Sequence, residues 1–254
     1  MVNIVLNERA FVENALDNLE LGPNMFETLS RIARYYYEEG YKKREIGCLI
    51  EEFLYKCDPD INIVKWQNLI DKVVRSADKY PLREISGVGI TEKELEKIKA
   101  LDDGMARRLM FTMLCLAKFG NAVNENNNGW VNRQDRDIFS LANIAISTKR
   151  QSLMLNKLWT EGYVGFSKVV DNININVKII DNENEPVITV CDFRNLGNRY
   201  RMICGEKYME CECCGAVVRR VANAQKFCRE CSAETNRKRT LGYYYNLTSS
   251  SLNT

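Results

Sequence analysis

The chain has 254 residues, of which 45% are apolar and 28% are charged, and a formal net charge of +2. This composition is typical of a globular protein with a packed core, the length suffices for about two domains, and the balanced charge excludes a polycationic chain. The complete lack of histidine excludes Ser/His and Cys/His nucleophile pairs and every His-containing metal site.

The start of the chain has neither a basic flank nor an apolar run of signal length, and no stretch of about eighteen apolar residues occurs. We therefore expect a cytoplasmic protein without a membrane span. Its ten cysteines then predict reduced thiols and a metal site rather than a disulfide framework. Some of them lie in apolar helix or strand contexts and are expected in the core: Cys48, Cys57, Cys115 and Cys191.

Residues 1 to about 101 are expected to be all-helical. Apolar residues at helical spacing predict helices over residues 26–37, 46–54 and 63–77. Thr91 and Glu94 form a capping-box pattern that opens a further helix, which runs to about residue 101.

The next region predicts the order helix, loop, helix, turn, helix and hairpin. An apolar helix is expected over residues 105–119, and the Asn-rich residues 121–129 read as a loop. A short helix over 135–145 and a tight break at Ile146–Ser147 precede a helix over 148–161.

The helix over 148–161 carries signals at both ends. Thr148 and Gln151 predict a variant of the capping box, and Gly162 suits a left-handed cap. Its apolar side chains are expected to be partly buried: Leu153, Leu155, Leu158 and Trp159. Period-two patterning then predicts a hairpin of residues 163–170 with 173–180, followed by a strand at 187–191.

This order is that of a winged helix-turn-helix, in which the third helix enters the major groove of DNA and the hairpin lies along the backbone. The residues expected to contact nucleic acid there are Thr148, Lys149, Arg150, Gln151, Asn156, Lys157 and, on the hairpin, Lys168. Winged helices also serve as protein–protein modules, and polar residues on a solvated helix face are common, so a protein-binding role is the alternative.

Two Cys-x2-Cys pairs follow, separated by thirteen residues. Four thiolates at this spacing predict a tetrahedral zinc site with the ligands Cys211, Cys214, Cys228 and Cys231. Gly215 allows the tight turn after the first pair. Cys213 is then spare, Cys204 is an outside candidate for a ligand, and residues 216–222 predict a strand within a zinc ribbon or treble-clef-like element.

Charge is segregated around these cysteines. From residue 215 to 240 there are seven basic and two acidic residues, a local net charge of +5 against +2 for the whole chain. This predicts a polyanion partner, and the alternative is an ordinary solvated surface. The basic residues expected to contact nucleic acid are Arg219, Arg220, Lys226, Arg237, Lys238 and Arg239.

The order of an apolar helix, an Asn-rich loop, the sequence Asp-Ile-Phe-Ser-Leu-Ala-Asn-Ile at 137–144, a basic helix and a hairpin resembles winged-helix proteins of phages and prophages. The cysteine pairs resemble the zinc knuckles that end many small phage-encoded proteins. Some of those winged-helix proteins initiate or organise replication and others are regulators. The resemblance covers about residues 105–240. It implies that the recognition helix carries Lys149, Arg150 and Gln151, and that the four cysteines of the two pairs bind zinc.

The predicted fold is mainly α with small β elements (α+β). We expect a helical domain over 1–103, a winged helix-turn-helix over 104–182, and a strand with a zinc ribbon and a polar tail from Thr248 over 187–254. The expected function is that of a non-enzymatic, zinc-containing DNA-binding protein of a phage or mobile element, in replication or transcription control in the host cytoplasm. The alternative is an adaptor or inhibitor that docks on a host or defence nucleoprotein complex. A metal-dependent nuclease, whose carboxylates can be scattered along a chain, is the enzymatic alternative.

Overall fold

The computed structural model describes residues 4–167 and 174–251, with side chains as far as Thr240. The chain divides into two compact units, which we call the N-terminal unit (Val5–Gly87) and the C-terminal unit (Met1–Ile4 with Val88–Thr254). The division falls earlier in the chain than the expected boundary at residue 103. It also places the expected second and third domains in one unit.

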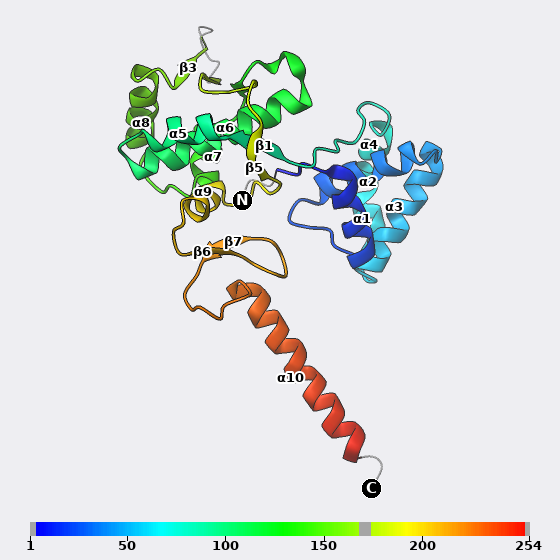
Figure 1. Cartoon of the computed structure of the whole chain (residues 1–254). Coiled ribbons are helices and arrows are strands. Elements are labelled where there is room, and N and C mark those ends of the chain that lie inside the picture. Colours follow the sequence, from blue (N-terminus) through cyan, green and yellow to red (C-terminus); the bar gives the residue numbers. More distant parts are fainter. Residues whose placement is uncertain (1–3, 168–173, 252–254) are drawn as a thin grey trace. The chain divides into compact units, whose positions relative to one another are not determined.

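The N-terminal unit is built of α1 (Glu8–Asn18), α2 (Met25–Glu38), α3 (Lys43–Cys57) and α4 (Ile63–Arg75) (Figure 1). Their apolar faces meet in a buried core that includes Leu29, Ile50 and Val73. Helix α1 is an addition to the predicted helices. It is capped by Asn7, whose side-chain oxygen accepts a hydrogen bond of 2.9 Å from the backbone N–H of Ala10.

A buried carboxylate holds this unit together. Glu8 is 1% exposed, and its oxygens accept hydrogen bonds from Arg31 Nε (3.1 Å), Arg34 Nη1 (3.0 Å) and Arg83 Nη2 (2.6 Å). Burial by itself raises the pKa of the carboxyl, but the hydrogen bonds from Arg83 and Arg34 outweigh burial and hold the pKa at about 2. The charge of Glu8 thus ties α1 to α2 and to the segment after α4.

The expectation that residues 1–101 are all-helical is wrong. Val88–Thr91 forms strand β1, which pairs antiparallel with β5 (Pro186–Val190). The pattern of so short a strand is weak, and its partner lies far away in the sequence. The predicted capping box is confirmed: the Glu94 N–H donates to Thr91 Oγ1 and the Thr91 N–H donates to Glu94 Oε2, at the start of α5 (Glu92–Lys99).

Helix α6 (Gly104–Val123) is the centre of the C-terminal unit, and most of its side chains from Leu109 to Phe119 are buried. It contacts α5, β1, α7 and α9. Lys118 of α6 forms an ion pair of 2.8 Å with the fully buried Glu94. The helix extends beyond the predicted residue 119, and the Asn-rich segment contains the short helix η1 (Glu125–Asn127).

The turn between α7 (Asp135–Leu141) and α8 (Thr148–Thr160) lies at Asn143 rather than at the predicted Ile146–Ser147. Asn143 has a left-handed φ of 54° and ends α7 earlier than predicted, because its N–H and the following N–H bond back to α7 carbonyls in a Schellman motif. The capping box predicted at Thr148 is also wrong. The N-cap of α8 is Ser147, and its side chain makes no capping hydrogen bond.

The sheet beside these helices has the antiparallel order β2–β4–β3, formed by β2 (Trp130–Val131), β4 (Ile175–Val177) and β3 (Val164–Phe166). The predicted pairing of the hairpin is confirmed for β3 and β4. Residues 168–173, including the candidate contact Lys168, lie outside the described part of the chain. Gly162, with φ 79°, ends α8 as predicted.

The chain then forms α9 (Leu196–Ile203), the hairpin of β6 (Tyr208–Glu210) and β7 (Val217–Arg219), and α10 (Arg229–Ser251) (Figure 1). The strand predicted over 216–222 is shorter, and the expected polar tail from Thr248 is helical as far as Ser251. All ten cysteines are free thiols. Of those expected in the core, only Cys115 is buried: Cys57 is half-buried, and Cys48 and Cys191 are exposed.

Candidate metal centre and basic surfaces

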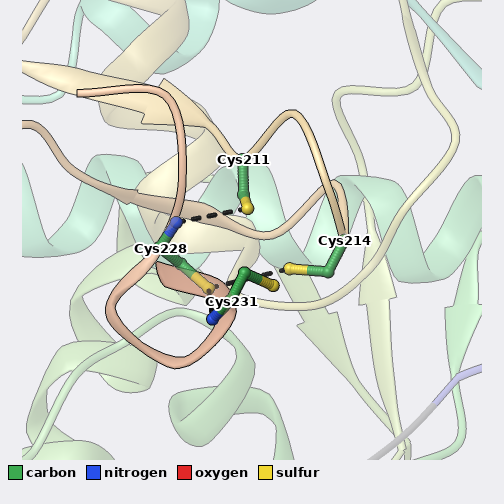
Figure 2. Close-up of side chains that lie close together, drawn as sticks. All are labelled: Cys211, Cys214, Cys228 and Cys231. Carbon is green, nitrogen blue, oxygen red and sulfur yellow. Dashed lines mark hydrogen bonds between the residues drawn. The ribbon is translucent and has the colours of Figure 1, made fainter. Parts of the chain in front are cut away.

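Two tight backbone segments bring four cysteines together (Figure 2). Cys211 directly follows β6, and Cys214 precedes Gly215, whose φ of 71° allows the chain to turn back so that the Gly215 N–H bonds to the Cys211 carbonyl at 2.9 Å. Cys228 precedes α10, and Cys231 lies in its first turn. The four sulfur atoms all lie within 4.8 Å of one another.

Backbone N–H groups point at these sulfurs. The Cys228 N–H donates to Cys211 Sγ at 3.2 Å, and the Cys231 N–H donates to Cys228 Sγ at 3.4 Å. Burial raises the pKa of the Cys211 thiol, but N–H groups of Cys214, Cys228 and Cys213 outweigh burial and lower the pKa to about 6. The turn is therefore arranged to stabilise a thiolate, the form in which cysteine binds metals.

The remaining thiols oppose further ionisation. Burial raises the pKa of Cys214, and the neighbouring thiols of Cys228, Cys214 and Cys213 raise the pKa of Cys231. Several thiolates can share so small a volume only if a cation offsets their charge. The cluster therefore has the electrostatic character of a metal site.

The geometry fits tetrahedral thiolate ligation. An ion bonded to four sulfurs at about 2.3 Å, as zinc is, holds them roughly 3.8 Å apart. Cys214 Sγ and Cys228 Sγ are 3.9 Å apart. Cys213 and Cys204 are both exposed and lie outside the cluster, so the structure brings together the four cysteines that the sequence predicts and neither of the alternatives.

The β6–β7 hairpin, which carries Cys211 and Cys214, is attached to α9. The Asn198 side chain donates to the carbonyl of Val217 at 3.4 Å, and Arg199 pairs with Glu210 at 3.6 Å. Arg194, just before α9, donates to the carbonyl of Cys214. The cluster is thus built on the C-terminal unit through contacts on both strands of the hairpin.

Helix α8 presents part of its predicted contact set to solvent. Thr148, Lys149, Arg150 and Asn156 are exposed, as is Lys157, which pairs with Glu161 at 3.6 Å. Gln151 is not free to read a base edge as expected: it is half-buried, and its Nε2 donates to the Ile146 carbonyl at 3.2 Å.

Two apolar side chains of α8 are more exposed than predicted. Leu155 and Leu158 are buried, whereas Leu153 is 60% exposed and Trp159 is 55% exposed. Trp159 lies beside Phe166 of β3, with ring centroids 6.2 Å apart. Only one side of α8 contributes to the core, and the other combines basic residues with exposed apolar ones.

The predicted basic residues around the cysteine cluster are all exposed: Arg219, Arg220, Lys226, Arg237, Lys238 and Arg239. Several have local partners. Arg220 Nη2 donates to the Asn223 carbonyl at 2.6 Å, Lys226 pairs with Glu212 at 3.6 Å, and Lys238 pairs with Glu234 at 3.8 Å.

The structure adds basic residues that the sequence window of 215–240 omits. Arg201 and Lys207 lie with Arg219 around one hollow. Counting charges along the sequence does not reveal this group of basic residues. The group forms only where the end of α9 meets the β6–β7 hairpin.

Among the described residues, no helix combines the length and the apolar character that crossing a bilayer requires. Comparison of the chain with protein-family models, with curated proteins and with solved structures found no match.

Proposed function

We propose that the protein is a zinc-containing nucleic-acid-binding protein whose main ligand is double-stranded DNA. The observation that carries this proposal is the exposed, basic first turn of α8, with Lys149 and Arg150 beside its N-terminus. The N-terminal end of a helix attracts phosphate through its unpaired N–H groups and its dipole. Two cations there add to this attraction.

A winged helix-turn-helix is the arrangement that would use this turn. Helices α6, α7 and α8 occur in the required order, and the sheet β2–β4–β3 supplies the hairpin of a wing. In such a module α8 enters the major groove. Leu153, on the exposed part of α8, would suit contact with a thymine methyl group.

Zinc is the metal that best suits the cysteine cluster. Tetrahedral sites of four sulfurs hold zinc or iron, and two Cys-x2-Cys pairs around a short hairpin are typical of structural zinc. When bound, the ion would supply positive charge to Cys211, Cys214, Cys228 and Cys231 and so hold the start of α10 against the β6–β7 hairpin.

A binding role is proposed over a catalytic one because of the ligand count. Four thiolates fill a tetrahedral shell, whereas catalytic zinc keeps one position for water or substrate. On the resemblance to phage and prophage winged-helix proteins, we propose a role in replication or transcription control of a phage or mobile element, in the host cytoplasm.

Fluorescence anisotropy with labelled duplex DNA, single-stranded DNA and RNA at low salt tests this function. We expect the duplex to bind and the affinity to fall steeply as salt rises, as for any ligand held through its phosphates. No binding to any of the three by the intact protein would refute the proposal.

A second candidate function rests on the exposed apolar residues of α8. Leu153 and Trp159 would suit the centre of a protein interface, where tryptophan is enriched. The protein would then be an adaptor or inhibitor on a host nucleoprotein complex. This role predicts a partner that still co-purifies after nuclease treatment and that a Trp159→Ala variant no longer binds.

A further inference from the structure

A hollow of about 410 Å³ lies between the C-terminal end of α9 and the β6–β7 hairpin. Its lining comprises Arg201, Glu206, Lys207, Tyr208 and Arg219. Cations outnumber carboxylates there by three to one. The hollow is separate from the cysteine cluster and from α8, so neither the metal nor the proposed groove-binding helix accounts for it.

Two backbone features bring these side chains close to one another. Gly205 has a left-handed φ of 78° and ends α9 in a Schellman motif, in which the Glu206 N–H donates to the Arg201 carbonyl at 2.9 Å. This turn brings the start of β6 back beside Arg201. Across the hairpin, Tyr208 is the pairing partner of Arg219.

The polar groups in the hollow are incompletely matched. Arg201 pairs with Glu206 at 3.5 Å, and its Nη1 donates to the hydroxyl of Tyr208. Within the described part of the chain, no carboxylate lies within ion-pair distance of Lys207 or Arg219. Lys207 and Arg219 therefore border the hollow without an ion-pair partner among the described residues.

The hydroxyl group of Tyr208 can donate a hydrogen bond into the hollow. Its oxygen accepts from Arg201, so its own hydrogen is available to an acceptor in the hollow. Arginine, lysine and a tyrosine hydroxyl together suit an oxyanion with several oxygens, and the planar guanidinium suits phosphate in particular. Clefts of this size commonly bind small ligands.

We propose that this hollow binds a phosphate group, with Arg201, Lys207 and Arg219 as its cationic contacts and Tyr208 as a hydroxyl donor. This inference rests on the proposed function for the source of the ligand, a backbone phosphate of nucleic acid. Such a contact would place the β6–β7 hairpin against the same polyanion as α8. Free inorganic phosphate is the other source of the same chemistry.

The test measures inorganic phosphate and duplex DNA separately, with the full-length, zinc-loaded protein. The variants are Lys207→Gln/Arg219→Gln, which removes two cations, and Tyr208→Phe, which removes only the hydroxyl. The control is Lys97→Gln/Lys99→Gln, which removes the same charge from exposed positions on α5. Metal content and circular dichroism establish that each variant is folded.

Phosphorus NMR of inorganic phosphate should show line broadening with the wild type and with the control. The broadening should be lost in Lys207→Gln/Arg219→Gln and reduced several-fold in Tyr208→Phe. No broadening with the wild type, or equal broadening with the double variant, would overturn the inference whatever happens with DNA.

Duplex binding then identifies the source. If the phosphate is a backbone phosphate, the double variant should bind duplex at least tenfold more weakly. The slope of log affinity against log salt concentration should also fall by about one to two, as expected for the loss of one or two phosphate contacts. Unchanged duplex binding alongside lost phosphate binding would overturn the nucleic-acid source and support free phosphate. Phosphate binding by a protein that binds no nucleic acid would support the hollow and refute the proposed function.

Discussion

The carbonyl oxygen of Ala142 occupies the space that a side chain on Gly197 would need. A Cβ atom on Gly197 would lie 1.9 Å from that oxygen. Helix α9 therefore lies directly against the turn between α7 and α8, and Asn143 in this turn donates to the side chain of Asn195 at 2.9 Å. Because α9 also contacts the β6–β7 hairpin, it joins the α7–α8 turn to the cysteine cluster.

Replacing Gly197 with alanine should destabilise the C-terminal unit by about 3 kcal/mol or more, because a methyl group would have to displace backbone rather than a flexible side chain. Chemical denaturation followed by circular dichroism measures the change. The control is Gly104→Ala, at the exposed start of α6, where an added Cβ meets nothing within 4 Å. Equal stability of the two variants would show that α9 does not lie against this turn.

The stability of the N-terminal unit should depend on the charge of Glu8. Its pKa in the folded chain is about 2, below the ordinary value of 4.5. Because the pKa is lower in the folded chain, ionised Glu8 stabilises the fold by about 3 kcal/mol at any pH above the pKa of the unfolded chain, 4.5. This contribution is lost as the pH falls from 4.5 towards 2. Urea titrations at several pH values, followed by the fluorescence of Trp66 in a Trp130→Phe/Trp159→Phe background, should record the loss.

A Glu8→Gln variant is the control for this titration. It should be less stable than the wild type by about 3 kcal/mol or more at neutral pH, because three arginines lose their buried carboxylate. It should also lose most of the pH dependence below 4.5. The same pH dependence in the variant and in the wild type would assign the effect to other carboxylates.

Removing the two cations at the start of α8 should weaken duplex binding. We expect Lys149→Ala/Arg150→Ala to lower the affinity at least tenfold and to reduce the salt slope by about two, one for each phosphate contact. Anisotropy titrations at several salt concentrations measure both quantities. Lys56→Ala/Lys65→Ala removes equal charge from exposed positions in the N-terminal unit and should leave both unchanged. An equal effect of the two pairs would mean that only net charge matters.

The parts of the structure that could be predicted from sequence are those with short-range causes. The spacing of Cys211 and Cys214, with Gly215 after them, largely determines the turn that collects the sulfurs. The capping box of Thr91 and Glu94 is likewise complete within four residues. In both cases the residues that make the contact are neighbours in the chain, so their spacing carries the information.

Other features depend on distant partners or on competing local bonds. The strand at Val88 requires its partner Val190. Gln151 is polar and lies on α8, but its side chain donates a hydrogen bond to the nearby Ile146 carbonyl, which a pattern of residue types does not reveal. Helix α10 has little apolar periodicity, so the usual signal for a helix is missing.

Native mass spectrometry of the purified protein shows whether the four cysteines form one structural metal centre. The wild type and Cys213→Ser should each retain one zinc ion per chain, because Cys213 lies outside the cluster, whereas Cys228→Ser should lose it. With Cys228→Ser placed in the Trp130→Phe/Trp159→Phe background, the fluorescence of Trp66 should report a folded N-terminal unit. Zinc retained by Cys228→Ser, or lost by Cys213→Ser, would contradict the ligand set.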